Sequence, residues 1–220
     1  AGFHSLDEDE IATWKERVQA GNLYVNRGVT GAIVRRQPFG GWKLSSIGPG
    51  AKAGGPNYVA LFRRGVPTDL SGAAESYAAA WREHFSRAHD PSALRCESNV
   101  FRYRPARGGV LRLPAPHAET QALAALAARL TGTPLVVSHA TAETDAAFAA
   151  RLPELARSAD FLRTLAPPPA AVLRAAHEAG LNWIDAPFSP DGRSELTRWL
   201  REQSVTETRH RYGNVLDRRR

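Results

Sequence analysis

A glycine-rich segment between residues 28 and 58 is the part of this 220-residue sequence whose residue types could bind a small anion. It holds eight glycines and three prolines, a density that is incompatible with a helix or a central strand. The small residues Gly31 and Ala32 leave their backbone N–H groups uncovered, and bare N–H groups in a turn form a cradle for a carboxylate. The alternative is that both are ordinary turn residues. We expect a long ordered loop, and such loops inside compact domains are usually functional.

The single cysteine, Cys96, is by type the residue best suited to nucleophilic chemistry. It lies beside Glu97 in a polar stretch, with no histidine and no predicted helix start next to it to activate its thiol. We therefore expect Cys96 not to be a nucleophile, and we expect His177 and His210 to be surface or core residues. One cysteine also excludes an intramolecular disulfide and a cysteine-rich zinc site. No G-x-S-x-G motif is present, so we predict no catalytic and no metal-binding residue in this chain.

Two motifs resemble the C-terminal end of the aldehyde dehydrogenase superfamily. The family pattern is G-N-x-x-x-N followed by P-F-G-G-x-K-x-S-G-x-G, and the sequence matches it at residues 21–26, at residues 38–45 and at Gly48. Ser46 departs from the usual glycine. The continuation GPGAKAGGPNY at residues 48–58 is similar to the Δ1-pyrroline-5-carboxylate (L-glutamate γ-semialdehyde) dehydrogenase branch, whether stand-alone or part of proline utilization A. The region after residue 62 weakly resembles the extra C-terminal part of long proline utilization A proteins.

The resemblance implies that the intact protein oxidises L-glutamate γ-semialdehyde to L-glutamate with NAD, in proline catabolism. Gly31 and Ala32 match the anchor-loop positions that hold the substrate's carboxylate, and Phe39 matches the aromatic residue that packs on its aliphatic carbons. In this family the nucleophilic cysteine, the general-base glutamate and the NAD-binding domain precede such a segment. We therefore expect this chain alone to be inactive, with NAD bound by an upstream domain.

Other residues of the two motifs have simpler expected roles. Asn22 and Asn26 are expected to be turn and cap residues, and Lys43 and Ser45 are expected to stabilise the loop. Phe39 has the alternative of being a side chain that fills the core.

Hydrophobic periodicity and glycine or proline breaks predict an α/β fold in two parts. Residues 1–62 would be the end of an aldehyde dehydrogenase catalytic domain, 63–74 a linker, and 75–220 a small open, mostly parallel α/β domain. Predicted helices cover 6–19, 75–88, 118–130, 143–157, 168–179 and 192–203, and predicted strands cover 23–25, 58–62, 109–113, 134–138, 160–165 and 181–185. The alternation of strand and helix indicates a parallel sheet. Without a GxGxxG motif, a dinucleotide site on that sheet would rest on analogy alone.

Composition limits the partners of the chain. Lys and Arg exceed Asp and Glu by 29 − 22 = 7, but the basic residues are spread out and lack the aromatic interleaving of single-strand binders, so we do not expect nucleic-acid binding. No apolar run approaches the ~18 residues of a membrane span. Because the sequence contains no methionine even at residue 1, we expect a segment of a longer protein. The single cysteine suits a reducing cytoplasm, where we expect the protein to act, and we also expect it to form homo-oligomers. The alternative function is a non-catalytic module, in which residues 75–220 mediate oligomerisation or cover the active site.

Overall fold

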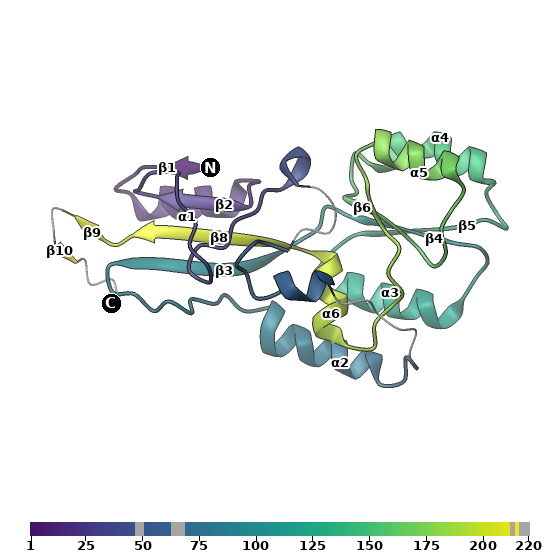
Figure 1. The fold of residues 1–220 in the computed structure, drawn as a ribbon, viewed down its shortest axis with the longest axis horizontal. Coiled ribbons are helices and arrows are strands. Elements are labelled where there is room, and N and C mark those ends of the chain that lie inside the picture. The colour runs from purple at the N-terminus through teal and green to yellow at the C-terminus, as the bar shows by residue number, and fades with distance from the viewer. Residues whose placement is uncertain (47–50, 63–68, 212–213, 216–220) are drawn as a thin grey trace.

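The computed structural model describes residues 1–46, 51–62, 69–211 and 214–215, and it contains two four-stranded sheets at opposite ends of an elongated molecule (Figure 1). The strands are β1 (Gly2–Phe3), β2 (Asn22–Val25), β3 (Glu97–Pro105), β4 (Gly109–Leu113), β5 (Leu135–His139), β6 (Phe161–Thr164), β7 (Asn182–Ile184), β8 (Leu200–Thr208), β9 (His210–Arg211) and β10 (Asn214–Val215). The helices are α1 (Glu8–Arg17), α2 (Ala73–Ala80), α3 (Ala118–Thr131), α4 (Asp145–Leu155), α5 (Ala170–Glu178) and α6 (Gly192–Leu196). Short helical turns cover Lys43–Ser45, Tyr58–Phe62, Trp81–Phe85 and Thr197–Trp199.

One sheet is wholly parallel, with the strand order β5-β4-β6-β7. Helices α4 and α5 cover one face and α3 lies on the other (Figure 1). The alternation along each strand separates the two cores: Val110 and Leu162 pack with α4 and α5, whereas Leu111 and Phe161 belong to the cluster that includes α2, α3 and α6. The prediction of a mostly parallel α/β region is thus confirmed.

The second sheet has the order β1-β2-β8-β3. Strand β8 lies in its interior, parallel to β2 and antiparallel to β3 along its whole length. Strands β1 and β2 come from the predicted segment 1–62, while β3 and β8 come from the predicted segment 75–220. A continuous sheet therefore joins the two segments, and the division between them stays a prediction. Residues 63–68 of the predicted linker lie outside the described residues, and its last two residues already begin α2.

The predicted strand at 58–62 is wrong, because Tyr58–Phe62 forms a 3₁₀ turn. Backbone hydrogen bonds from Tyr58 to Gly55 and from Ala60 to Asn57 close this turn. Tyr58 and Val59 are exposed rather than inserted between neighbouring strands. A short apolar run does not by itself distinguish a strand from a helical turn.

The predicted helix at 192–203 is correct only in its first part. The chain leaves α6 after Leu196, passes through a single 3₁₀ turn and becomes strand β8 at Leu200. The sequence of β8, LREQSVTET, is mostly polar, yet seven of its nine residues are buried. Strand β3, for which the sequence pattern predicted no element, likewise contains polar residues that are buried. Both strands escape detection because their polar side chains find partners inside the protein.

A buried ion pair connects the parallel sheet to α6. The Arg163 guanidinium of β6 contacts both carboxylate oxygens of Glu195, and both side chains are almost fully buried. Arg198 and the indole N–H of Trp199 also donate to this carboxylate, at 2.9 Å each. Burial is the largest single effect and raises the pKa of Glu195, but the charges and hydrogen bonds of Arg163, Arg198 and Trp199 together outweigh it and hold the pKa below its ordinary value.

We predict that Glu195→Ala destabilises the protein by about 3–5 kcal/mol, because it leaves the Arg163 charge buried without its partner. Chemical denaturation followed by circular dichroism measures this. Glu83→Ala is the control, since the exposed Glu83–Arg82 pair should contribute less than about 0.5 kcal/mol. Equal losses in the two variants would contradict the assignment.

Candidate functional site

The first part of the glycine-rich loop presents two backbone donors to solvent. Gly31 has a left-handed φ of 99°, a conformation that favours glycine. The Tyr24 hydroxyl of β2 donates to the Gly31 carbonyl at 3.0 Å and fixes this point of the loop to the sheet. Gly31 and Ala32 are both exposed, and within the described part of the chain their N–H groups reach no acceptor. The loop thus offers a pair of adjacent free N–H donors.

Phe39 lies further along the same loop, after a compact turn. The N–H groups of Arg36 and Gln37 both donate to the Ile33 carbonyl, which closes the turn. Phe39 then exchanges two backbone hydrogen bonds with Ala53. Phe39 is 59% exposed in this chain, so the alternative in which it fills the core is not what the structure shows. All three predicted site residues therefore lie on one loop.

Asn22 of β2 holds the backbone on both sides of Phe39. Its amide nitrogen donates to the Pro38 carbonyl at 3.0 Å, and its oxygen accepts from the Gly40 N–H at 3.1 Å. The predicted turn role is thus wrong for Asn22, which is a strand residue that binds the loop. Asn26 does occupy a turn, with φ 56°, and its oxygen accepts from the N–H of Ser5.

The predicted stabilising role is seen for Ser45, whose hydroxyl donates to the Trp42 carbonyl at 2.7 Å. A Cβ atom at Gly41 would lie 2.0 Å from the Ser45 hydroxyl oxygen, so this close approach requires glycine. Lys43 is exposed with φ 58°, and no hydrogen bond or ion pair joins its ammonium to another described residue.

A buried pair of charges anchors the second half of the loop. Glu202 of β8 accepts from the Lys52 N–H at 2.6 Å and from the Asn57 side chain at 2.8 Å. The Lys52 ammonium in turn donates to Asn22, at 2.8 Å, and to the Gly40 carbonyl. Burial lowers the pKa of Lys52 to about 8 and is only partly opposed by the charge of Glu202. Burial also raises the pKa of Glu202, against the effect of its donors and of the Lys52 charge.

A second carboxylate ties the loop to the other strand of the pair. Glu97, at the start of β3, forms ion pairs with Arg27, at 2.9 Å, and with Arg36. The Asn99 amide also donates to it at 2.9 Å. Glu97 and Glu202 therefore hold the glycine-rich loop from two adjacent strands. Neither was singled out in the sequence, because their partners lie about 60 to 150 residues away.

The outer surface of this loop is apolar. Of the ten large hydrophobic side chains that are exposed in the described chain, six lie between residues 29 and 59; they are Val29, Ile33, Val34, Phe39, Tyr58 and Val59. Such a concentration of exposed hydrophobic side chains is typical of an interaction surface.

Residues of the kinds that catalyse or bind metals are not gathered at the loop. Cys96 is exposed just before β3, and no hydrogen bond or ion pair joins its thiol to another residue of the described chain. His177 and His210 are both exposed, on α5 and β9. Among the described residues, no three His, Cys, Asp or Glu side chains cluster in a way that could hold a metal ion. No helix of the described chain is long and apolar enough to cross a membrane.

The parallel sheet has a strand order typical of nucleotide-binding sheets, but its connecting loops differ from those that bind a nucleotide. Its strand order changes direction between β4 and β6, where such sheets bind phosphates on glycine-rich turns. Here the connections that follow these strands, 114–117 and 165–169, contain five prolines, which have no N–H group. The start of α3 is already capped by the His117 ring, which accepts from Thr120. These residues do not fit the pyrophosphate of NAD.

Part of this chain is similar to known aldehyde dehydrogenases. Residues 1–63 match the model of the aldehyde dehydrogenase family. This segment is therefore similar to that family. Over 58 residues the chain is 52% identical to the bifunctional protein PutA of Rhizobium meliloti, and over 64 residues it is 50% identical to 1-pyrroline-5-carboxylate dehydrogenase of Bacillus thuringiensis (strain Al Hakam). These matches cover 26% and 29% of this chain, and only 5% and 12% of the relatives.

The similarity extends beyond the aldehyde dehydrogenase segment. The structure of proline utilization A (PutA) from Corynebacterium freiburgense matches 97% of this chain with a TM-score of 0.78 and 41% sequence identity. The chain spans 23% of that protein. The later, α/β part therefore has a counterpart in a PutA protein, as the sequence had indicated.

We predict that Glu202→Gln weakens the attachment of the loop, because the new amide places N–H groups opposite a donor. The expected loss is about 1.5–3 kcal/mol of unfolding free energy, with faster amide hydrogen exchange at Lys52. Glu16→Gln is the control: Glu16 is exposed and paired with Arg104 at the surface, so little change is expected. Unaltered exchange at Lys52 in Glu202→Gln would refute the attachment.

The lowered pKa of Lys52 predicts a specific pH dependence. The pKa of Lys52 is its ordinary value of 10.5 in the unfolded chain and about 8 in the folded protein. The unfolded state therefore binds more protons between these values, and the free energy of unfolding rises with pH across this interval, by up to roughly 3 kcal/mol. Lys52→Met should lack this rise, while Lys43→Met, at an exposed lysine, should keep it. Denaturation at pH 7, 8, 9 and 10 makes the comparison.

Proposed function

We propose that the intact protein containing this chain is an NAD-dependent dehydrogenase that oxidises L-glutamate γ-semialdehyde to L-glutamate in proline catabolism. This chain would supply the loop that anchors the substrate and a domain for assembly, and alone it would be inactive. The observation that carries the proposal is the pair of free N–H groups at Gly31 and Ala32. They lie in a segment whose curated relatives are named 1-pyrroline-5-carboxylate dehydrogenase and PutA.

The role of the loop follows from the chemistry of the substrate. L-Glutamate γ-semialdehyde carries a carboxylate at the end opposite the aldehyde, so a site must bind an anion at one end and leave the other free to react. The N–H groups of Gly31 and Ala32 would bind this carboxylate. The exposed ring of Phe39 would pack against the aliphatic carbons, since small-molecule sites combine an apolar wall with a few polar groups. The reacting aldehyde would then point away from this chain.

NAD, when bound, supplies the acceptor for the hydride that leaves the substrate. Because the loops of the parallel sheet do not fit a pyrophosphate, the proposal assigns both NAD and the nucleophile to other parts of the intact protein. The contribution of this chain is to bind and orient the substrate. We further propose that the protein acts in the cytoplasm.

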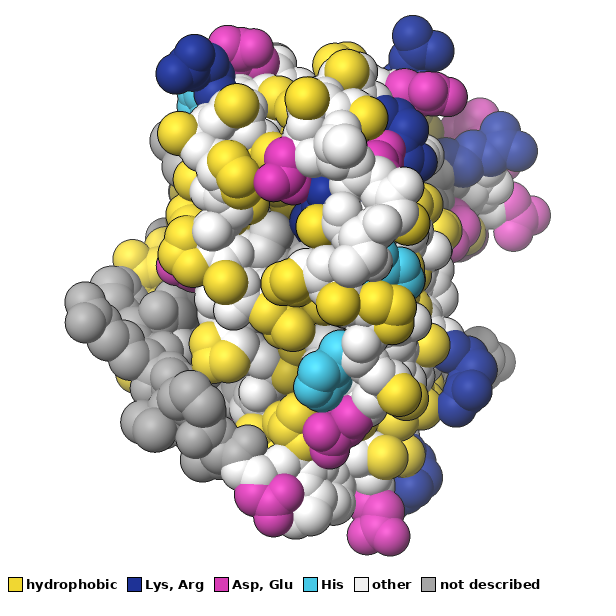
Figure 2. Space-filling model, turned by 90° about the vertical axis from the view of Figure 1, so that its right-hand side faces the viewer, with side chains coloured by type: hydrophobic (Ala, Val, Ile, Leu, Met, Phe, Trp, Pro, Cys, Tyr) yellow, Lys and Arg dark blue, Asp and Glu magenta, His cyan; other side chains and the backbone are white. Residues whose placement is uncertain are grey.

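The assembly role of the later region has support of its own. Figure 2 shows the end of the molecule that carries α4, α5 and β5, where apolar side chains spread across the middle of the face and charged ones lie mostly at its margin. Val136 and Val137 of the edge strand β5 and Leu165 belong to the exposed hydrophobic residues. An open strand edge with exposed apolar side chains favours association with another chain. This observation equally favours the alternative of a non-catalytic oligomerisation module.

Substitution of Ala32 in the intact protein separates these functions. Ala32→Pro removes one N–H donor, and loss of a hydrogen bond to a charged group costs on the order of 1.5–3 kcal/mol, so kcat/KM for L-glutamate γ-semialdehyde should fall about ten- to a hundred-fold. Steady-state production of NADH provides the measurement. An aldehyde of similar length without the carboxylate should lose much less.

Phe39→Leu is the companion variant, and it should slow both aldehydes because its ring contacts the carbon chain that they share. If Ala32→Pro slowed both aldehydes equally in a folded protein, the N–H groups would not bind the carboxylate. The purified 220-residue chain should produce no NADH from the semialdehyde, and measurable turnover would show that this chain holds the nucleophile after all.

A further inference from the structure

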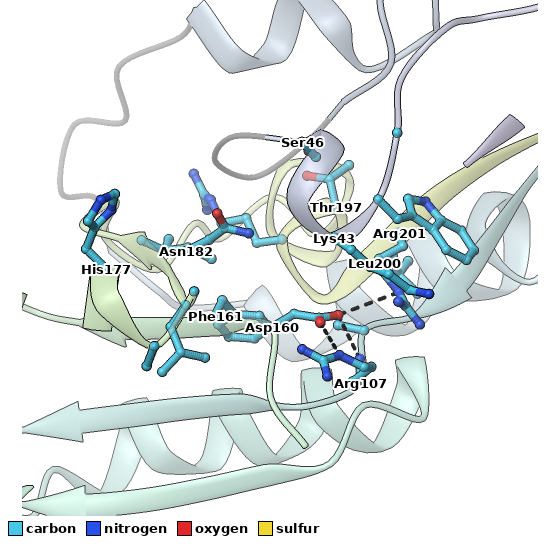
Figure 3. Close-up of a pocket in the computed structure, with 18 residues that line it drawn as sticks. Lys43, Ser46, Arg107, Asp160, Phe161, His177, Asn182, Thr197, Leu200 and Arg201 are labelled. Atoms are coloured by element: carbon cyan, nitrogen blue, oxygen red, sulfur yellow. Dashed lines mark hydrogen bonds and ion pairs between the residues drawn. The ribbon is translucent and has the colours of Figure 1, made fainter. Parts of the chain in front are cut away.

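A cavity of about 550 Å³ lies between the two sheets (Figure 3), and Gly31, Ala32 and Phe39 are not among the residues that line it. Its volume is in the range of small-molecule sites. The short turn that carries Lys43 and Ser46 forms one side, and the end of α5 with His177 and the start of β7 with Asn182 form another. Buried apolar side chains, among them Phe161 and Leu200, contribute the rest of its wall.

Positively charged side chains outnumber negatively charged ones in the lining of this cavity. Four cationic side chains line it, together with one carboxylate, Asp160. Asp160 is engaged by Arg107, whose Nε donates to it at 2.6 Å and whose other N–H groups donate to backbone carbonyls of residues 156, 157 and 159. Each of the three guanidinium nitrogens of Arg107 therefore has an acceptor within the protein. Of the remaining cations, Arg198 pairs with the buried Glu195 at 2.9 Å, Arg201 makes only a more distant contact of 3.6 Å with Asp160, and Lys43 pairs with no carboxylate of the described chain.

These three cations keep hydrogen-bond donors that no described residue accepts. Arg201 uses its Nε and one terminal nitrogen on the carbonyl of Pro105 and on Gln19. Arg198 uses one terminal nitrogen on Glu195. The Lys43 ammonium has no acceptor in the described chain.

Arg201 is a largely buried cation with charged neighbours. Burial is the largest effect and lowers the pKa of Arg201; the charge of Asp160 raises it, and the charges of Arg107 and Arg104 lower it. The guanidinium also lies over the Trp42 ring, 4.5 Å from its centre. A buried cation with cationic neighbours gains most from an oxyanion brought beside it.

We propose that this cavity is a binding site for a small organic anion, whose carboxylate or phosphate group lies among Lys43, Arg198 and Arg201 and whose carbon body contacts Phe161 and Leu200. Guanidinium and ammonium groups bind these two oxyanions by the same charge-assisted hydrogen bonds. The site takes one wall from the aldehyde dehydrogenase segment and the others from the later region. The proposal does not depend on the substrate assigned to the anchor loop.

Benzoate and phenyl phosphate test the site with a shared ring and different head groups, and benzyl alcohol is the neutral control. Isothermal titration of the 220-residue chain should detect at least one of the two anions and no binding of benzyl alcohol. The preferred anion identifies the head group. Lys43→Gln should weaken that anion about tenfold or more without altering the melting temperature, and Lys43→Arg should restore most of the affinity.

Arg129→Gln is the matched control, because Arg129 is an exposed arginine on α3 that does not line the cavity. It removes one positive charge and should leave the affinity unchanged. Equal weakening by Lys43→Gln and Arg129→Gln would indicate attraction to the net charge alone and overturn the proposal, as would failure of both anions to bind. The same titration on the intact protein should reproduce the Lys43→Gln effect; loss of that effect would mean that other residues occupy the cavity, which also overturns it.

Discussion

A carboxylate in the interior of a protein needs hydrogen-bond donors around it, and Glu202 meets this need with groups from the glycine-rich loop. It lies on the central strand β8, where its oxygens accept from the Lys52 backbone and the Asn57 side chain. Burying the carboxylate without those donors would cost several kcal/mol. If the loop left the sheet, this carboxylate would either become exposed to water or stay buried without its hydrogen-bond donors. The position of Phe39, which lies between the groups fixed by Asn22, depends on the same arrangement.

The chain order makes this arrangement strongly non-local. The loop precedes β8 by about 150 residues. Its attachment to Glu202 therefore joins two parts of the chain that the parallel α/β unit separates in sequence. That unit brings β3 and β8 back to β2 as an antiparallel pair. Closing so long an intervening segment adds little free-energy cost beyond that of a moderate one. An insertion of this size between a binding loop and its supporting strand is thus physically tolerable, and its two ends meet in a single sheet.

How far the sequence foretold the structure depends on where the partners of each residue lie. The parallel region was predictable because its strands and helices carry local apolar patterns, as at Gly109–Leu113, whose bounds agree with prediction. Strand β8 was not, because Gln203 and Ser204 are buried against Ala20 and Pro38, partners that no local pattern reveals. The site divides in the same way. Gly31, Ala32 and Phe39 stand within a recognisable motif, whereas Glu202 and Glu97 act through contacts that only the fold creates.

The parallel sheet illustrates why topology alone does not assign chemistry. Its strand order would suit a nucleotide, but a phosphate needs free N–H groups at the carboxyl ends of the strands, and prolines remove them there. Free N–H groups occur instead at Gly31 and Ala32, on a loop that the other sheet supports. The parallel unit packs α2, α3 and α6 against one face and joins them to β8 through the Arg163–Glu195 pair and Trp199. Its physical effect on the loop is therefore indirect: it fixes where β8 begins, and β8 carries the carboxylate on which the loop is held.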